Sequence, residues 1–202
     1  RVNDATLIPR PETEHLVVEA LDCARQFSLD RPLQVIDVGT GSGAIAISVV
    51  QNCESAEMTA VDVSEDALEI ARWNAQTHQV VDRIQFLHSD LFSNVEQPDR
   101  FDIVCSNPPY VSEAEYSELA PTVRDFEPRL ALVSGPEGTE VIARLLEQVP
   151  DRLHVGGRLI VELSPMIAAA CEEIALANPA FGDLRFIKDL EGHRRVLSLK
   201  RV

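Results

Sequence analysis

The tetrapeptide Asn107-Pro108-Pro109-Tyr110 has the residue types needed to bind a flat NH2 group. Each proline lacks a backbone N–H and fixes φ near roughly −65°, so the turn is stiff and offers carbonyl acceptors without competing donors. The Asn107 side-chain oxygen and the Pro108 carbonyl can each accept one hydrogen of an amide or exocyclic amine, while the Tyr110 ring packs against its flat face. The alternative is an ordinary loop, because Asn and Pro are common turn residues.

A glycine-rich loop upstream indicates a second ligand. It follows the predicted strand Leu33–Val38 and precedes a small, apolar stretch, residues 44–50, that predicts a helix. The loop residues are Gly39, Thr40, Gly41, Ser42 and Gly43. Alternate glycines let the backbone approach a ligand closely, and a helix N-terminus offers free N–H groups. The Gly-x-Gly-x-Gly spacing differs from the dinucleotide motif, so the loop favours a nucleotide-like cofactor over a pyrophosphate.

Two acidic residues follow the next two predicted strands. Asp62 ends the predicted strand 57–62, where a carboxylate can hold ribose hydroxyls. Ser64 is the expected N-cap of the following helix, which leaves Asp62 free for the ligand. Asp90 follows the predicted strand 83–87 and could accept a hydrogen bond from an adenine amino group, or could cap its loop.

The order of these features resembles the class I, S-adenosylmethionine-dependent methyltransferases, and five sequence blocks narrow the resemblance to the HemK/PrmC family. The blocks are residues 8–14, 37–43, 106–110, 127–128, and 188–190 with 195–196. Members of this family are protein-(glutamine N5) methyltransferases that modify peptide-chain release factors. The resemblance covers nearly the whole chain, and five blocks in order are far more specific than any one of them.

The resemblance implies roles for individual residues. The implied cofactor contacts are Asp37, Gly39, Thr40, Gly41, Ser42, Gly43, Asp62, Asp90, Leu91 and Asn107. The implied contacts with the substrate glutamine are Asn107, Pro108, Pro109 and Tyr110. S-adenosyl-L-methionine would be the cofactor, S-adenosyl-L-homocysteine the product, and a release factor with a Gly-Gly-Gln loop the protein partner.

The chain departs from the family pattern at two places. Leu163-Ser164-Pro165-Met166 stands where relatives have a glycine and soon a glutamine, which puts contacts near that loop in doubt. The family also has a small helical domain before the catalytic one, and this chain starts almost directly at the Pro-Arg-Pro segment. We therefore expect residues 1–202 to be the catalytic domain, residues 1–30 to be linker and first helix, and the helical domain to be absent.

The periodicity of the chain predicts an α/β fold with a doubly wound, mostly parallel, seven-stranded sheet. Residues 12–27 predict an amphipathic helix, and strands then alternate with helices as far as residue 106. We expect a loop from residue 111 to residue 136, a helix through residues 141–149, a fifth strand opened by Gly156-Gly157, and a terminal antiparallel hairpin. Because right-handed crossovers place the carboxyl ends of parallel strands on one edge, Gly39, Asp62 and Asn107 should converge on a single cleft.

The charge of the chain bears on the choice of substrate. The 202 residues include 33 acidic and 18 basic side chains, for a net charge of −15. Nucleic-acid binding depends on Lys and Arg neutralising phosphates, so direct nucleic-acid binding is not expected. Adenine and guanine amino-group methyltransferases nevertheless share Asn-Pro-Pro-Tyr-like turns and remain an alternative. A cofactor-binding module without turnover is a third.

The remaining sequence signals are mostly negative. The longest apolar stretch is well short of the roughly 20 residues of a membrane span, and no signal-peptide pattern begins the chain, which predicts a cytoplasmic location without membrane contact. The four cysteines, Cys23, Cys53, Cys105 and Cys171, are widely spaced, as are the five histidines. We therefore expect reduced thiols and no metal site.

Overall fold

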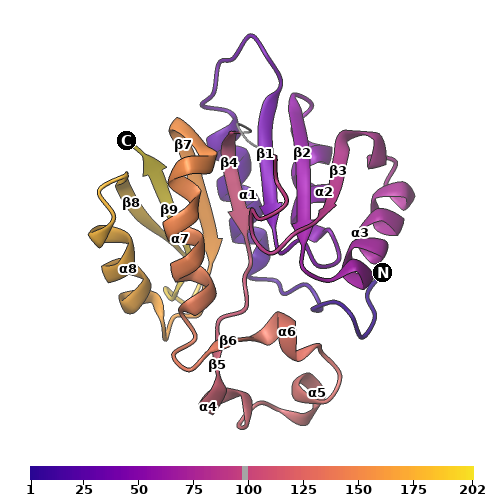
Figure 1. The fold of residues 1–202 in the computed structure, drawn as a ribbon, viewed down its shortest axis with the longest axis vertical. Coiled ribbons are helices and arrows are strands. Elements are labelled where there is room, and N and C mark those ends of the chain that lie inside the picture. Colours follow the sequence, from indigo (N-terminus) through magenta and orange to yellow (C-terminus); the bar gives the residue numbers. More distant parts are fainter. Residues whose placement is uncertain (97–99) are drawn as a thin grey trace.

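The computed structural model describes residues 1–96 and 100–202, and its centre is a seven-stranded sheet. Across the sheet the strands run β3 (Ile84–His88), β2 (Ala56–Asp62), β1 (Leu33–Val38), β4 (Phe101–Ser106), β7 (Leu153–Glu162), β9 (Arg194–Arg201) and β8 (Phe181–Lys188). All neighbouring pairs are parallel except those of β9, which is antiparallel to both β7 and β8. The predicted fold class and terminal hairpin are confirmed (Figure 1).

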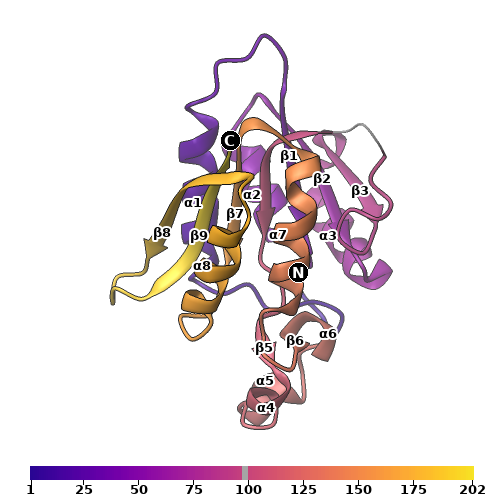
Figure 2. The ribbon, with the colours of Figure 1, turned by 60° about the vertical axis from the view of Figure 1, so that its left-hand side comes forward.

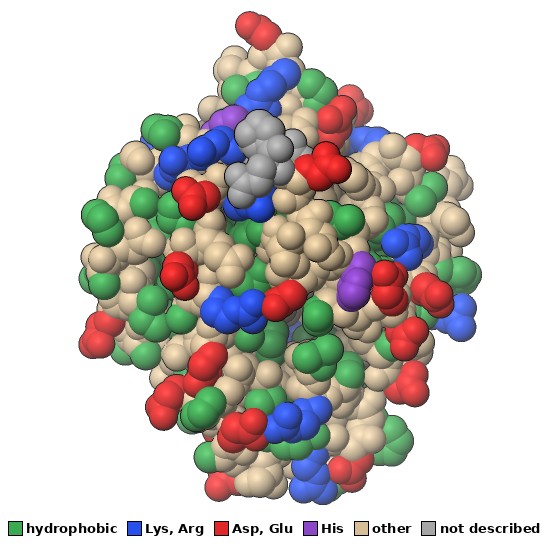
Figure 3. All heavy atoms as spheres, in the orientation of Figure 1, with side chains coloured by type: hydrophobic (Ala, Val, Ile, Leu, Met, Phe, Trp, Pro, Cys, Tyr) green, Lys and Arg blue, Asp and Glu red, His purple; other side chains and the backbone are tan. Residues whose placement is uncertain are grey.

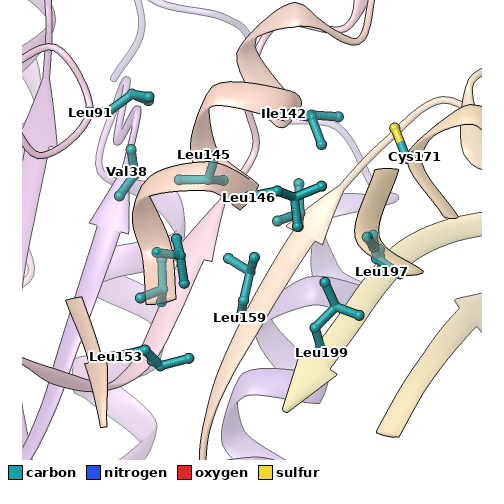
Figure 4. Packing of buried hydrophobic residues seen from close by; sticks show 14 of the residues in the cluster. Val38, Leu91, Ile142, Leu145, Leu146, Leu153, Leu159, Cys171, Leu197 and Leu199 are labelled. Carbon is teal, nitrogen blue, oxygen red and sulfur yellow. The ribbon is translucent and has the colours of Figure 1, made fainter. Parts of the chain in front are cut away.

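Helices cover both faces of the sheet. They are α1 (Thr13–Ala24), α2 (Ala44–Asn52), α3 (Glu65–Thr77), α7 (Glu140–Arg152) and α8 (Ala168–Ala177), with a short 3-10 helix at Val81–Arg83. One buried cluster joins α1, α2 and the last turn of α3 to the sheet, and the other joins α7 and α8 to its opposite face. Figure 4 shows Leu145 and Leu146 of α7 packed over Leu159 of β7, with Ile142 in the same cluster. The two clusters therefore hold in place the strands whose ends carry the polar residues.

The carboxyl ends of the central strands meet at one edge of the sheet. Val38, at the end of β1, is paired with Val61 on one side and with Ser106 on the other. Ser106 is in turn paired with Val161 of β7. Strand order reverses between β1 and β4, and such a switch point opens a crevice beyond the strand ends. The loops that follow β1, β2, β4 and β7 therefore surround one region.

The segment from residue 111 to residue 136 was predicted to be a loop, and that prediction is wrong. It contains β5 (Val111–Ser112), α4 (Glu113–Tyr116), α5 (Pro121–Arg124), α6 (Arg129–Leu132) and β6 (Val133–Gly135). Figures 1 and 2 show these elements together below the carboxyl edge of the main sheet. Ser112 and Glu115 form a capping box that starts α4. Helices of four residues are too short to give a periodic pattern in the sequence.

The start of the fifth sheet strand in the sequence was also predicted wrongly. β7 begins at Leu153, and Gly156-Gly157 lies inside it at a register shift opposite Phe101 and Ile103. Gly156 has φ +85°, and a Cβ on Gly157 would come within 2.8 Å of the Asp102 carbonyl oxygen. The two glycines therefore allow an irregularity within the strand rather than opening it.

Helix α1 is fastened to the terminal hairpin through a buried carboxylate. Glu19 accepts hydrogen bonds from Ser198 Oγ at 2.7 Å and from Arg185 Nη2 at 2.6 Å. Because Glu19 is buried, these bonds compensate the loss of its hydration.

No helix in the described part of the chain has the length and apolar character needed to span a membrane.

Candidate active site

A cavity of about 590 Å³ lies at the carboxyl edge of the sheet, beyond β1, β2 and β4. Its lining includes Gly39, Thr40, Gly41, Ser42, Asp62, Asp90, Leu91, Asn107, Pro108 and Pro109. The predicted convergence of Gly39, Asp62 and Asn107 on one cleft is confirmed. A volume of this size lies within the roughly 300–1,000 Å³ range of small-molecule sites.

The glycine loop presents its backbone to this cavity. Gly39 and Gly41 have φ of +76° and +55°, a region that other residues rarely adopt. A Cβ at either position would have no protein atom within 4 Å, so the space over the loop is open for a ligand. Gly43 serves helix packing instead, because a Cβ there would lie 3.2 Å from the Ala71 Cβ. This glycine therefore allows α2 and α3 to pack closely.

Asp37 lies beneath the glycine loop and does not line the cavity. Its Oδ2 accepts hydrogen bonds from Thr40 Oγ1 at 2.7 Å and from Ala46 N at 3.3 Å. Its Oδ1 is buried and has no hydrogen-bond partner among the described residues. Complete burial raises the pKa of Asp37 to about 7, against the lowering effect of the two hydrogen bonds. Asp37 therefore supports the loop from below.

We expect Asp37→Asn to remove part of the pH dependence of stability. Between the pKa of an unfolded Asp and about 7, the folded protein keeps a proton that the unfolded chain releases, so stability falls as pH rises. One such proton contributes a slope of at most about 1.4 kcal/mol per pH unit. Urea unfolding at several pH values measures it, with the exposed Asp22→Asn as control. A slope in Asp37→Asn equal to that of the wild type, between about pH 4 and about pH 7, would contradict the assignment.

Asp62 lines the cavity. The sequence suggested that its carboxylate would be free of protein contacts, and in the structure it is not. Its Oδ2 accepts a hydrogen bond from Gly41 N at 2.8 Å, and its Oδ1 accepts one from Ser64 N at 2.9 Å. Ser64 does cap α3, because its Oγ accepts from Ala67 N at 3.2 Å. Asp62 thus couples the glycine loop to the start of α3, and each carboxylate oxygen keeps a further acceptor position. Burial raises its pKa above the usual value.

Asp90 and Leu91, which follow β3, also line the cavity. Asp90 Oδ2 is 2.7 Å from Arg144 Nη2 of α7, so this carboxylate is ion-paired at the rim. Leu91 has a positive φ of 49° and is buried. Both residues therefore lie at the cavity wall, their contact with the cofactor stays a prediction, and the Arg144 contact was not foreseen.

Asn107 carries an unused acceptor. Its Nδ2 donates to Thr13 Oγ1 at 3.3 Å, whereas its Oδ1 is buried and has no partner in the described part of the chain. Asn107, Pro108 and Pro109 line the cavity. Tyr110 does not, and its ring packs against the hydrophobic cluster under α7. The structure therefore brings three of the four turn residues to the cavity wall.

Two segments that the sequence did not assign to the site also form its walls. Residues 4–7 and Pro9 line it from the N-terminal side, and Pro128, Leu130 and Ala131 line it from the α6 side. Arg10 Nη2 joins these walls through a 2.5 Å ion pair with Glu127 Oε1, whose side chain is only 2% exposed. The sequence signals that could have indicated these two walls were the Pro-Arg-Pro and Glu-Pro segments.

The other candidate features lie outside the cavity. Residues 163–166 are not part of its lining. All four cysteines are free, and three are buried. Burial raises the pKa of Cys23 to about 12 and of Cys171 to about 11. No cluster of His, Cys, Asp and Glu suited to a metal ion occurs in residues 1–96 and 100–202.

Comparison with known proteins agrees with this geometry. The family model "Methyltransferase small domain" matches residues 15–123. A release factor glutamine methyltransferase of Rhodopirellula baltica is 52% identical over 202 residues, which is all of this chain and 68% of that protein. The chain belongs to the release factor glutamine methyltransferase family. A family member from Bacillus subtilis is 36% identical over 198 residues, covering 97% of this chain and 68% of its own length.

Solved structures outside this family share the fold. The ribosomal protein L11 methylase of Lactobacillus delbrueckii has a TM-score of 0.66 and 22% identity, covering 95% of this chain and 80% of that one. The hMettl16 catalytic domain, solved in complex with the MAT2A 3′UTR hairpin 6, has a TM-score of 0.74 and 16% identity, covering 99% of this chain and 73% of that one. At these identities the likeness concerns the fold alone. The chain spans about two thirds of the length of the curated family members.

Proposed function

We propose that this protein transfers a methyl group from S-adenosylmethionine to the side-chain amide nitrogen of a glutamine in a peptide-chain release factor. The observation that supports it most directly is the buried, unpartnered Oδ1 of Asn107, a residue that lines the cavity. Leaving a buried acceptor without a partner costs about 1–3 kcal/mol, so a substrate donor is expected there. The NH2 of a glutamine side chain is such a donor.

The residues around the glycine loop suit S-adenosylmethionine. Open space above Gly39 and Gly41 leaves room for the cofactor against the loop backbone, and Asp62 offers carboxylate acceptors for ribose hydroxyls. Asp90 and Leu91 lie farther along the same cavity, where an adenine would fit. When bound, the cofactor supplies a methyl group on a positively charged sulfur.

The protein contributes mainly by positioning the glutamine. Its amide nitrogen is a weak nucleophile because its lone pair is shared with the carbonyl. Hydrogen bonds donated by this NH2 to Asn107 Oδ1 and the Pro108 carbonyl would raise the electron density on the nitrogen and fix its direction. In well-oriented intramolecular reactions such positioning lowers the barrier by roughly 7–11 kcal/mol. The nitrogen becomes strongly acidic after transfer, so its proton can leave without a dedicated base.

Charge favours a protein substrate over nucleic acid. On the face drawn in Figure 3, acidic side chains are spread among the basic ones, in keeping with the net charge of −15. Phosphate binding needs clustered Lys and Arg. An amino-group methyltransferase of adenine or guanine would bind the same chemical group, and a module without turnover would bind only the cofactor, so both are outcomes of the test.

Transfer of a labelled methyl group tests the proposal. Purified protein with labelled S-adenosylmethionine is expected to label a release factor that bears a Gly-Gly-Gln loop, and mass spectrometry should locate the methyl group on that glutamine. A release factor with this glutamine changed to alanine is the control and should stay unlabelled. Labelling of RNA or DNA instead, or cofactor binding with no labelled product, would overturn the proposal.

A further inference from the structure

Behind the cavity wall lies a buried carboxylate that the sequence did not assign to the site. Glu162 is the last residue of β7, and its neighbour Val161 is paired with Ser106 at the end of β4. Glu162 and Asn107 therefore leave two adjacent parallel strands side by side. Glu162 is 2% exposed, and its Oε2 has no hydrogen-bond partner among residues 1–96 and 100–202.

Two neutral side chains stand between this carboxylate and the cavity. Thr13 and Asn107 both line the cavity, and both lie close enough to Glu162 for their polar side chains to lower its pKa, while burial raises that pKa by more. Asn107 also donates to Thr13 Oγ1 at 3.3 Å. Amide, hydroxyl and carboxylate thus lie together, and the Asn107 amide oxygen is the acceptor that keeps no partner among the described residues.

The acceptor-only chemistry of a carboxylate fixes how the Asn107 amide is turned. Ionised Glu162 can accept hydrogen bonds but cannot donate them, so the NH2 group of Asn107 must face Glu162 and Thr13. The Oδ1 is then left for another donor, in agreement with its lack of a partner among the described residues. A nearby negative charge also polarises the Asn107 amide and makes its oxygen a stronger acceptor.

We propose that Glu162, together with the Thr13 hydroxyl, is a positioning residue that holds the Asn107 carboxamide with its oxygen free to accept the substrate NH2 group. This inference rests on the proposed function and deepens it, because it names what sets the direction of the substrate-binding acceptor. Glu162 acts through Asn107 and does not line the cavity. It is therefore expected to affect turnover more than substrate or cofactor binding.

Several charged groups face Glu162 and enter any pH dependence. Glu12, at the start of α1, raises the pKa of Glu162, and Arg195 of β9 lowers it. Tyr110 faces the same group, because Glu162, Arg195, Arg10 and Glu12 all act on the pKa of its phenol. Tyr110 stays neutral in the working range, since burial raises its pKa to about 12. The acid limb of the kcat profile is then expected to follow Glu162.

The main variant is Glu162→Gln, which keeps the shape and removes the charge. With saturating cofactor and release factor, we expect kcat to fall about 10-fold to 100-fold, by analogy with the loss of groups that orient metal-binding side chains. KM and the cofactor Kd should change by less than about 3-fold, because neither ligand touches Glu162. The acid limb of the pH profile that we expect for the wild type should be absent from the variant.

A second pair of variants tests the hydroxyl. Thr13→Val removes the hydroxyl at nearly constant volume and should lower kcat. Thr13→Ser keeps the hydroxyl, and most of the wild-type kcat should remain. Glu19→Gln is the matched control, since Glu19 is also a buried glutamate but binds Ser198 and Arg185 of the terminal hairpin and has no hydrogen bond to Asn107 in the described part of the chain. Its thermal stability is compared directly with that of Glu162→Gln, and its kcat should equal that of the wild type.

A measurement without turnover separates this inference from the proposed function. The side-chain NH2 signals of Asn107 in an NMR spectrum, identified by their loss in Asn107→Ala, should shift in Glu162→Gln and stay in place in Glu19→Gln. If the wild type fails to methylate a release factor, the proposed function falls, and the NMR signals still decide the role of Glu162. Unmoved Asn107 signals, or a wild-type kcat with an unchanged acid limb in Glu162→Gln, would overturn the inference.

Discussion

Asn107→Ala is expected to lower kcat for methylation of a release factor by about 10²-fold to 10³-fold, similar to the loss of one preorganised hydrogen-bonding group in other active sites. The variant removes the acceptor that we assign to the substrate NH2 group. Cofactor affinity should stay near the wild-type value, because the glycine loop and Asp62 lie on other strand ends. Single-turnover labelling gives the first quantity, and calorimetric titration with S-adenosylmethionine gives the second.

The control for this experiment is Asn52→Ala, which changes an exposed asparagine at the end of α2. It should leave both turnover and cofactor binding unchanged. Asn107 was also predicted to contact the cofactor, and the experiment distinguishes the two roles. An equal loss of turnover and cofactor affinity would mean that Asn107 serves mainly the cofactor.

The central strands could be predicted because their sequence signal is local and strong. β1 matches its predicted bounds residue for residue and β4 ends at residue 106 as predicted, since both are mostly apolar runs in the middle of a parallel sheet and are followed by glycine or Asn-Pro. Once β1, β2 and β4 were parallel, the rule for strand crossovers placed Gly39, Asp62 and Asn107 at one edge. The cavity confirms that placement.

The features that the sequence missed depend on contacts between distant parts of the chain. Glu162 and Thr13 are 149 positions apart in the sequence (162 − 13), and both help to orient the Asn107 side chain. Only the pairing of β4 with β7 shows that Glu162 emerges beside Asn107. A signal did exist, because a carboxylate at the end of a buried strand resembles Asp62 at the end of β2. The sequence alone does not say which strands are neighbours.

Asp62 illustrates a different limit. Sequence reasoning assigned the capping role to Ser64 and left Asp62 free, on the view that one helix start needs one cap. In the structure Asp62 accepts from Ser64 N as well as from Gly41 N, so the carboxylate organises two backbone segments. Carboxylates have several acceptor positions, and a one-role assignment underestimates them.

These contacts lead to a prediction for Asp62→Ala: cofactor affinity should fall by roughly 5-fold to 150-fold, which corresponds to about 1–3 kcal/mol for charge-assisted hydrogen bonds. Two losses add here. The ribose acceptors disappear, and the Gly41 N–H loses the partner that holds the glycine loop in place. Calorimetric titration with S-adenosylmethionine and with S-adenosylhomocysteine should show similar losses, because the two ligands share the ribose.

Asp62→Asn separates the two contributions. An amide keeps one acceptor oxygen and can still hold Gly41 N or Ser64 N, but it lacks the charge, so its affinity loss should lie between those of the wild type and Asp62→Ala. Asp82→Ala, which removes an exposed acid in the 3-10 helix, should bind the cofactor as the wild type does. A wild-type Kd in Asp62→Ala would contradict both contributions. At saturating cofactor, kcat of Asp62→Ala should stay well above that of Asn107→Ala, since the acceptor for the substrate amide remains intact.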